Sequence, residues 1–178
     1  MNRLMNDLDV ELDAYLWQNV NLLQKKIQNA KALIVRNQTQ VNRELIDAAP
    51  HLKIIARAGV GLDNVDTHYA HEKGIIVCYT PDANSLSVAE LTIGLMLALL
   101  RKIPEARQDT LTGGWNRVKF TGSELYGKTF GLIGMGRIGT LTATRAHAFG
   151  MKIIAADPYL AFDAPQLKQM NGKLVSQD

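Results

Sequence analysis

KTFGLIGMGRIGTLTATRAHAFGMKIIAADP, residues Lys128 to Pro158, is the stretch of this sequence that decides the fold. It opens with a short apolar run of strand length, Thr129–Ile133, and the glycine-rich segment GMGRIG follows at once. A helical pattern continues to Phe149, where Gly150 can supply a left-handed C-cap, and Met151–Ala156 is a second apolar run. The order of strand, glycine turn, helix and strand predicts a nucleotide-binding βαβ unit.

The three glycines of this turn have separate conformational roles. Gly134 allows the tight turn, Gly136 lets the backbone approach a pyrophosphate, and Gly139 lets the helix pack closely on the strand. The N–H groups that open the helix would face an anion, and the helix dipole adds about half a positive charge. A G-x-G-x-x-G turn alone does not exclude a strand-to-helix turn that binds nothing, but here both strands and the helix accompany it.

A carboxylate at the end of the second strand completes the predicted site. Asp157 follows Gly139 by 18 positions (157 minus 139), close to the ~20-residue spacing at which an acidic side chain hydrogen-bonds the adenosine ribose. Its negative charge would repel a 2′-phosphate. The sequence therefore predicts NAD as the cofactor rather than NADP.

The composition of the 178 residues is typical of a globular protein, with 47% apolar and 21% charged residues. The net charge of +3, from 20 basic and 17 acidic residues, has no clustered basic run, which argues against nucleic acid as a partner. Leu91–Leu100 is the longest apolar run and is shorter than the ~20 residues that span a bilayer. With one cysteine, Cys78, and no pattern of a signal peptide, we expect a cytoplasmic protein without membrane contact.

The first half of the chain alternates helical patterns with apolar runs. Predicted strands at 32–35, 52–56 and 75–79 lie between predicted helices at 18–30, 42–49 and 67–73. Continuous apolar runs in this order predict a parallel sheet covered on both faces, with Cys78 as a small core residue. Because ligands of such sheets bind at the carboxyl ends of the strands, Arg36 and Arg57 are placed at the ligand edge.

A loop around residues 80–86 predicts a domain boundary, giving domains 1–83 and 84–178. Ser87 and Glu90 form a predicted capping box that opens an apolar helix to about Leu100. Pro104 predicts the start of a further helix that ends at Gly113, and 115–128 is irregular. Beyond Tyr159 only one short helix is expected.

Four blocks of this sequence together resemble a known family. RNQT at 36–39, RAGVGLDNVD at 57–66, NSLSVAE at 84–90 and the stretch from 127 to 159 closely resemble the D-isomer-specific 2-hydroxyacid dehydrogenases, most of all their phosphoglycerate dehydrogenase branch. The resemblance implies an α/β protein with a flavodoxin-like substrate domain, followed here by the first half of a Rossmann NAD-binding domain. It also implies oxidation of a 2-hydroxy acid, such as 3-phosphoglycerate, by hydride transfer to NAD.

The resemblance assigns substrate-binding roles to five residues. Val60 and Gly61 match the loop whose backbone N–H groups hold the substrate carboxylate. Arg36 and Arg57 match positions that face the substrate, and Arg117 is a weaker match to a further substrate-side arginine. Without the resemblance, an arginine after a strand is more often a solvated surface residue.

On the cofactor side, Arg137, Ile138 and Asp157 match residues that contact the pyrophosphate and the adenosine ribose. The family's catalytic arginine, glutamate and histidine would all lie beyond Asp178, and the family has another strand before the region that matches Tyr15. The resemblance therefore implies a chain truncated at both ends that has no catalytic residue and is inactive alone. None of the four histidines falls at a family site, and no metal site is predicted.

Two further functions stay open at this point, a non-enzymatic NAD-sensing module and a module that only dimerises. The family pairs through the long helix and the nucleotide domain, so the resemblance implies a homodimer. A sheet cut through its middle would also expose an edge and an apolar face that invite self-association. Asp63 and Asp66, in a glycine loop that runs into a helix, are expected to be turn and cap residues, and Met135 a plain loop side chain.

Overall fold

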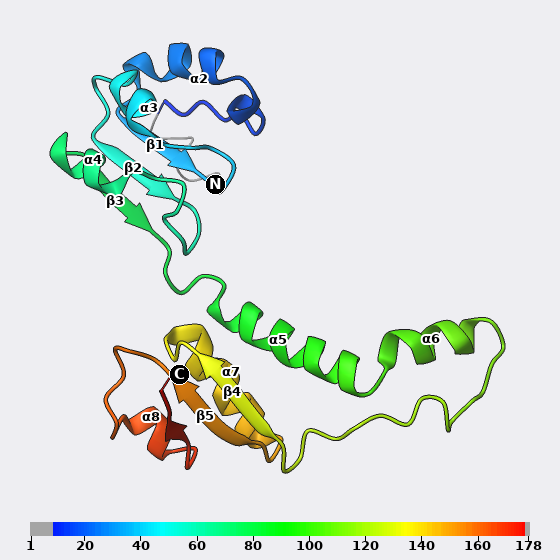
Figure 1. Cartoon of the computed structure of the whole chain (residues 1–178). Coiled ribbons are helices and arrows are strands. Elements are labelled where there is room, and N and C mark those ends of the chain that lie inside the picture. Colours follow the sequence, from blue (N-terminus) through cyan, green and yellow to red (C-terminus); the bar gives the residue numbers. More distant parts are fainter. Residues whose placement is uncertain (1–8, 177–178) are drawn as a thin grey trace. The chain divides into compact units, whose positions relative to one another are not determined.

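The computed structural model (Figure 1) describes residues 9–176, which divide into two compact units on either side of the Ala83–Asn84 peptide. Each unit has a three-stranded sheet in which all neighbouring strands are parallel, with the orders β1-β2-β3 and β4-β5-β6. The predicted α/β class with parallel sheets is therefore confirmed.

In the first unit, helices alternate with strands as the sequence predicts, and side-chain caps fix where the helices begin. Asn19, Asn42 and Asp66 each accept a hydrogen bond from a backbone N–H three residues later, which satisfies a donor that the first helical turn leaves unpaired. The elements are η1 Leu16–Gln18, α2 Val20–Lys26, η2 Ile27–Asn29, β1 Ala32–Val35, α3 Arg43–Asp47, β2 Ile54–Arg57, α4 Thr67–Glu72 and β3 Ile76–Tyr79.

One face of this first sheet carries the core and the other is open. Ile55 on the central strand is 0% exposed and packs with residues such as Val35 and Leu23. On the opposite face Ile34 is 63% exposed and Ile76 60% exposed, and Cys78 is exposed beside them. The expectations of a sheet covered on both faces and of a buried Cys78 are therefore wrong, because an apolar run shows that a strand is apolar but not which of its faces another element covers.

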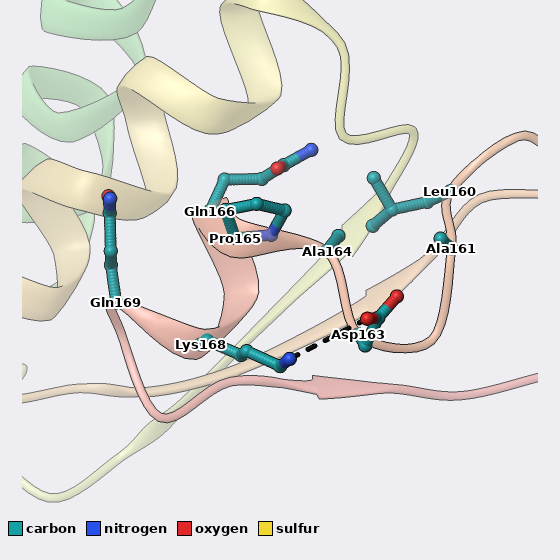
Figure 2. A pocket seen from close by; sticks show the side chains of 8 residues that line it. All are labelled: Leu160, Ala161, Asp163, Ala164, Pro165, Gln166, Lys168 and Gln169. Atoms are coloured by element: carbon teal, nitrogen blue, oxygen red, sulfur yellow. Dashed lines mark ion pairs between the residues drawn. The ribbon is translucent and has the colours of Figure 1, made fainter.

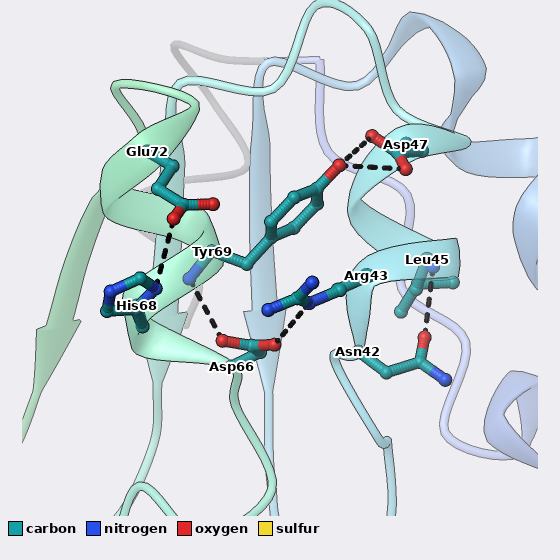
Figure 3. Close-up of polar contacts among 8 residues, drawn as sticks. All are labelled: Asn42, Arg43, Leu45, Asp47, Asp66, His68, Tyr69 and Glu72. Carbon is teal, nitrogen blue, oxygen red and sulfur yellow. Dashed lines mark hydrogen bonds and ion pairs between the residues drawn. The ribbon is translucent and has the colours of Figure 1, made fainter.

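A polar cluster ties α3 to α4 on the surface of this unit (Figure 3). The Tyr69 hydroxyl donates to the Asp47 carboxylate at 2.8 Å, and Lys73 Nζ lies 2.7 Å from the same carboxylate. Arg43 Nε lies 3.3 Å from Asp66 Oδ2, and both Arg43 and Lys73 lie 5.0 Å from the centre of the Tyr69 ring. These contacts hold α3 and α4 together, because two helices this short have little surface with which to fix their own packing.

The cluster predicts that the first unit loses stability in acid. The Lys73 ammonium and then the Tyr69 hydroxyl lower the pKa of Asp47 below its ordinary 3.8. The Tyr69 backbone N–H and then Arg43 lower the pKa of Asp66. A carboxyl with a lowered folded pKa stabilises the fold above its unfolded value, and that contribution is lost as the pH falls through the folded pKa.

We therefore expect the melting temperature of the first unit to fall between about pH 5 and pH 2. Asp47→Asn should weaken that dependence, because it removes one of the groups that titrate. Asn37→Ala, at an exposed position that carries no titrating group, is the control and should leave the dependence unchanged. An Asp47→Asn profile parallel to that of the parent chain would contradict the prediction.

The second unit begins with a long helix that packs on the helix of the nucleotide-type βαβ unit. Ala89 on α5 and Ala143 and Ala146 on α7 are fully buried, and such small side chains allow two helices to approach closely. None of the helices in residues 9–176 is long and apolar enough to cross a membrane. The elements are α5 Ser85–Leu100, α6 Ile103–Leu111, β4 Thr129–Ile133, α7 Arg137–Ala148, β5 Lys152–Ala156, α8 Pro165–Lys168 and β6 Lys173–Leu174.

Two local expectations for this unit are wrong. The helix α5 starts at Ser85, and Val88 N–H already donates to Asn84 O, so Ser87 lies within the first turn and cannot act as an N-cap. The predicted capping box is therefore absent. The sequence analysis also missed β6, which pairs in parallel with β5 through Lys173 and Leu174.

An arm made of α6 and the irregular segment after it projects from the second unit (Figure 1). Lys102 starts the arm in a left-handed conformation with φ of 51°. The returning chain meets the end of α5 where Ser123 N–H donates to Leu100 O at 2.9 Å. Gly122 is required there, because a Cβ on it would lie 2.3 Å from the same carbonyl oxygen. The two ends of the arm are thus joined at its base.

Candidate functional site

The glycine turn links β4 to α7 in the geometry that a nucleotide-binding turn requires. Gly134 has φ of +89°, a conformation that favours glycine, and its N–H donates to Ala156 O on the neighbouring strand at 2.8 Å. A Cβ on Gly139 would lie 2.4 Å from Gly134 O, so only glycine permits this approach of helix to strand. The turn is therefore tight at its first glycine and closely packed at its third.

The amino end of α7 offers N–H groups to the solvent side of this turn. Gly136 is the N-cap and has no side chain to cap the helix. The N–H groups of Gly136, Ile138 and Gly139 come before the first i→i−4 bond of the helix, so no carbonyl of the same helix accepts them in that way. Gly134, Gly136 and Arg137 are exposed, and a Cβ on Gly136 would meet nothing within 4 Å. Open space in front of unpaired donors and a helix dipole can receive a phosphate group.

Asp157 lies beside the turn and is held by two backbone donors. Its Oδ2 accepts from Met135 N–H at 2.7 Å and its Oδ1 from Tyr159 N–H at 2.9 Å. These two hydrogen bonds, Met135 first, lower the pKa of the Asp157 carboxyl, which keeps it ionised at neutral pH. The predicted ribose acceptor is thus charged and adjacent to the predicted phosphate site. Ile138, in the first turn of α7, is half-buried.

Met135 differs from the expectation of a plain loop side chain. It is 3% exposed and belongs to the apolar core of the second unit, with Ile153 and Leu167. A methionine flanked by two turn glycines gives no sequence signal for burial. The turn is consequently anchored from beneath by one of its own residues.

In the first unit, the predicted substrate residues gather at the carboxyl ends of β1 and β2. The Arg57 guanidinium lies over Gly59 in the following loop, and a Cβ on Gly59 would collide with its Nη1. Its buried Nε has no partner in this structure.

Among the described residues, the N–H groups of Val60 and Gly61 also have no acceptor, and Arg36 at the end of β1 is exposed. The Asp63 carboxylate lies against Gly61. Unpaired donors beside a guanidinium can bind a carboxylate or phosphate.

Asn64 locks the two loops of this edge together, a role that the sequence analysis missed. Its side chain is 3% exposed, and Nδ2 donates to Arg36 O and Thr39 O, each at 2.7 Å. The backbone adds a bridge in which Val41 N–H donates to Asn64 O and Asp66 N–H donates to Val41 O. An asparagine in a glycine loop reads from sequence as a turn residue, so only its burial reveals the clamp.

Asn64→Ala is expected to lower the free energy of unfolding of the first unit by about 2 kcal/mol, since two hydrogen bonds are lost inside the protein. Asn64→Asp should be at least as damaging, because a carboxylate has no N–H to donate to the two carbonyls. Asn37→Ala, at an exposed position of the β1–α3 loop, should stay within about 0.5 kcal/mol of the parent chain. Urea denaturation of the three variants measures these differences; equal stability of Asn64→Ala and Asn37→Ala would refute the clamp.

Arg117 belongs to the second unit, whereas Arg36 and Arg57 belong to the first. Its guanidinium lies over the Trp115 ring, 5.5 Å from the ring centre, in a shallow hollow at the end of α6. A second shallow hollow lies beside α8, where Lys168 pairs with Asp163 at 3.6 Å (Figure 2). Within the described part of the chain, no three His, Cys, Asp or Glu side chains converge as a metal site would require.

Comparison with known sequences gives the family. Residues 3–169 match the family described as D-isomer specific 2-hydroxyacid dehydrogenase, catalytic domain. The chain belongs to this family of 2-hydroxyacid dehydrogenases. A D-3-phosphoglycerate dehydrogenase of Methanocaldococcus jannaschii is 56% identical to it over 138 residues, which are 78% of this chain and 26% of that protein. A hydroxypyruvate reductase of Thermotoga maritima is 50% identical over 155 residues, 87% of this chain and 50% of that one.

A solved 2-hydroxyacid dehydrogenase of Aquifex aeolicus shares the fold. This D-lactate dehydrogenase, complexed with NAD and lactic acid, superposes with a TM-score of 0.84 at 28% identity, covering 99% of the present chain and 51% of that protein. The chain thus spans between a quarter and a half of the length of these 2-hydroxyacid dehydrogenases.

Proposed function

We propose that residues 84–178 carry the adenosine and pyrophosphate half of an NAD site, and that residues 1–83 carry part of the site for a 2-hydroxy acid. The observation that carries the proposal is the ionised Asp157 next to an exposed helix end that follows a glycine turn. The turn would bind the pyrophosphate, with Arg137 and Ile138 contributing to that contact. Asp157 would accept the ribose hydroxyls and repel a 2′-phosphate.

The substrate side of the proposal rests on the carboxyl edge of the first sheet. Val60 and Gly61 would donate their N–H groups to the substrate carboxylate, and Arg57 would offer its unpaired Nε. Arg36 would supply further positive charge, which favours a phosphorylated acid such as 3-phosphoglycerate over an uncharged analogue. The relation to D-3-phosphoglycerate dehydrogenases supports the same substrate.

Reaction requires more than these contacts. Hydride transfer to NAD needs a base that takes the hydroxyl proton, and such a base contributes about 10²–10⁴ in rate. The contacts assigned above are binding contacts, so the proposal made from them is binding of NAD(H) and of the hydroxy acid.

Calorimetric titration of the chain with NADH tests the cofactor site directly. We expect saturable binding of NADH and at least tenfold weaker binding of NADPH. Replacement of Asp157 by serine, which is short and uncharged, should narrow the difference between the two dinucleotides. Absence of any heat of binding at millimolar NADH would reject both the dehydrogenase-type site and the alternative NAD-sensing role.

A dimerising role is favoured by one observation, the exposed ridge of Leu91, Leu95 and Leu99 on α5. These leucines follow one another at four-residue spacing and so lie on one side of the helix. An apolar ridge of this kind is expected to be covered by another protein surface. We propose that the ridge is the contact between two copies of this chain, whether or not the chain also binds NAD.

Leu95→Lys is expected to convert the dimer to a monomer, because it places two charges in the middle of the contact. Light scattering after gel filtration measures the mass of each species. Thr144→Lys, which adds the same charge to an exposed position on α7, should remain dimeric. A parent chain that is monomeric at all accessible concentrations would disprove the proposed contact.

A further inference from the structure

The peptide groups around Met135 are held from three directions. Its N–H donates to Asp157 Oδ2 at 2.7 Å, and its carbonyl accepts from Thr140 Oγ1 at 3.2 Å. Its side chain is 3% exposed in the core beneath the turn. The end of β5, the first turn of α7 and the core therefore all converge on the one residue between the first two glycines of the turn.

This arrangement fixes the chain that enters α7, a helix that has no side-chain cap. Gly136 is the N-cap and has no side chain, so it cannot fix the direction of the chain that enters the helix. The hydrogen bond to Asp157 is charge-assisted and short, and such bonds are about twice as strong as neutral ones. Without the Asp157 carboxylate, the Met135 N–H would lose its charged acceptor, and the glycines on either side would leave this peptide group free to change direction.

We propose that Asp157 is a positioning residue for the glycine turn: it holds the Met135 N–H, so that the donors of Gly136, Ile138 and Gly139 face outward together before any ligand arrives. The inference rests on the proposed NAD site and adds to it. The same carboxylate would serve the pyrophosphate half of the site through the turn and the ribose half through direct contact. A carboxylate has about four acceptor positions, and two are used here, so ribose hydroxyls can be accepted without releasing Met135.

Amide hydrogen exchange in the ligand-free chain tests the positioning role without any dinucleotide. In the parent chain the Met135 amide should exchange slowly. Asp157→Asn keeps one uncharged acceptor oxygen for which the Met135 and Tyr159 N–H groups compete, so its protection of Met135 should be intermediate between those of the parent chain and Asp157→Ala. In Asp157→Ala it should exchange at least tenfold faster, while amides in β5 such as Ile153 keep their protection and show that the unit is folded. Unchanged exchange of Met135 in Asp157→Ala would overturn the proposal.

Inorganic pyrophosphate, which has no ribose, separates the two roles of the carboxylate. If Asp157 only accepted ribose hydroxyls, Asp157→Ala would bind pyrophosphate at least as well as the parent chain, because a nearby negative charge is removed. The positioning role predicts about tenfold weaker binding in Asp157→Ala and partial recovery in Asp157→Asn. Equal or tighter binding by Asp157→Ala would overturn it.

Thr140→Val provides the test if Asp157→Ala does not fold. It keeps the shape of the side chain and removes only the hydroxyl that donates to the Met135 carbonyl, so exchange at Met135 should rise several-fold. The outcomes also separate the two proposals. Protection of Met135 that depends on Asp157, in a chain that binds no NADH, supports the positioning role and rejects the NAD site. Binding of NADH with no change at Met135 in either variant supports the NAD site and rejects the positioning role.

Discussion

Replacing Gly139 by alanine is expected to destabilise the second unit by about 2 kcal/mol. The added Cβ would lie 2.4 Å from the carbonyl oxygen of Gly134, and backbone atoms must move to relieve the contact. Alanine favours a helix over glycine by about 1 kcal/mol, so any measured loss understates the steric cost. Because the displaced atoms belong to the turn itself, we also expect at least tenfold weaker binding of NADH.

Gly136→Ala is the matched control, with the same added methyl group three residues earlier. Nothing lies within 4 Å of its Cβ position and its φ of −71° suits any residue, so only the poorer N-cap preference of alanine should count, and the loss of stability should stay below about 1 kcal/mol. The methyl group would still occupy space in front of the first-turn donors, and NADH binding should weaken. Urea denaturation and calorimetry of both variants measure the two effects. Equal loss of stability in both would show that the turn has another conformation in solution.

Ile55→Ala is expected to cost the first unit about 3 kcal/mol. Ile55 is 0% exposed at the centre of β2, and truncation of a buried isoleucine removes apolar contact and leaves a cavity. Trp17 lies in this unit and reports its unfolding by fluorescence. A Trp115→Phe background removes the signal of the second unit. The midpoint of urea denaturation in this background measures the loss.

Ile34→Ala is the control for this prediction, because it removes the same atoms from the same sheet on its open face. At 63% exposure the side chain makes few contacts, and the cost should stay below about 1 kcal/mol. A cost near that of Ile55→Ala would mean that another surface covers this face in solution. Dilution would then lower the stability of the parent chain, since association stabilises by mass action.

Much of the fold follows from local sequence, because several elements combine a clear pattern with a clear end. Thr129–Ile133 and Ala32–Val35 have the predicted bounds, since each apolar run is closed by a residue that does not continue a strand. Asp66 caps α4 as predicted, and Gly150 has the left-handed φ of 75° expected at the end of α7. In each case the decisive interaction lies within a few residues.

One error is local: Ser87 and Glu90 have the spacing of a capping box, but the helix begins where Asn84 O accepts its first hydrogen bond. The other errors depend on residues distant in sequence. The two-residue β6 exists only because β5 lies beside it. The clamp at Asn64 and the burial of Met135 likewise arise from contacts with other segments. Sequence therefore predicts where the candidate sites lie, but not how their loops are held.

The joined base of the arm has a consequence for how this molecule can vary. Leu100 and Ser123 are hydrogen-bonded to each other, so the segment between them is a loop whose two ends are held together at its base. The entropy of closing such a loop grows only with the logarithm of its length, so lengthening the segment costs the remainder little. The segment is therefore suited to the insertion of a foreign peptide or a fluorescent label, because an insert would affect the rest of the second unit only through the two ends of the loop.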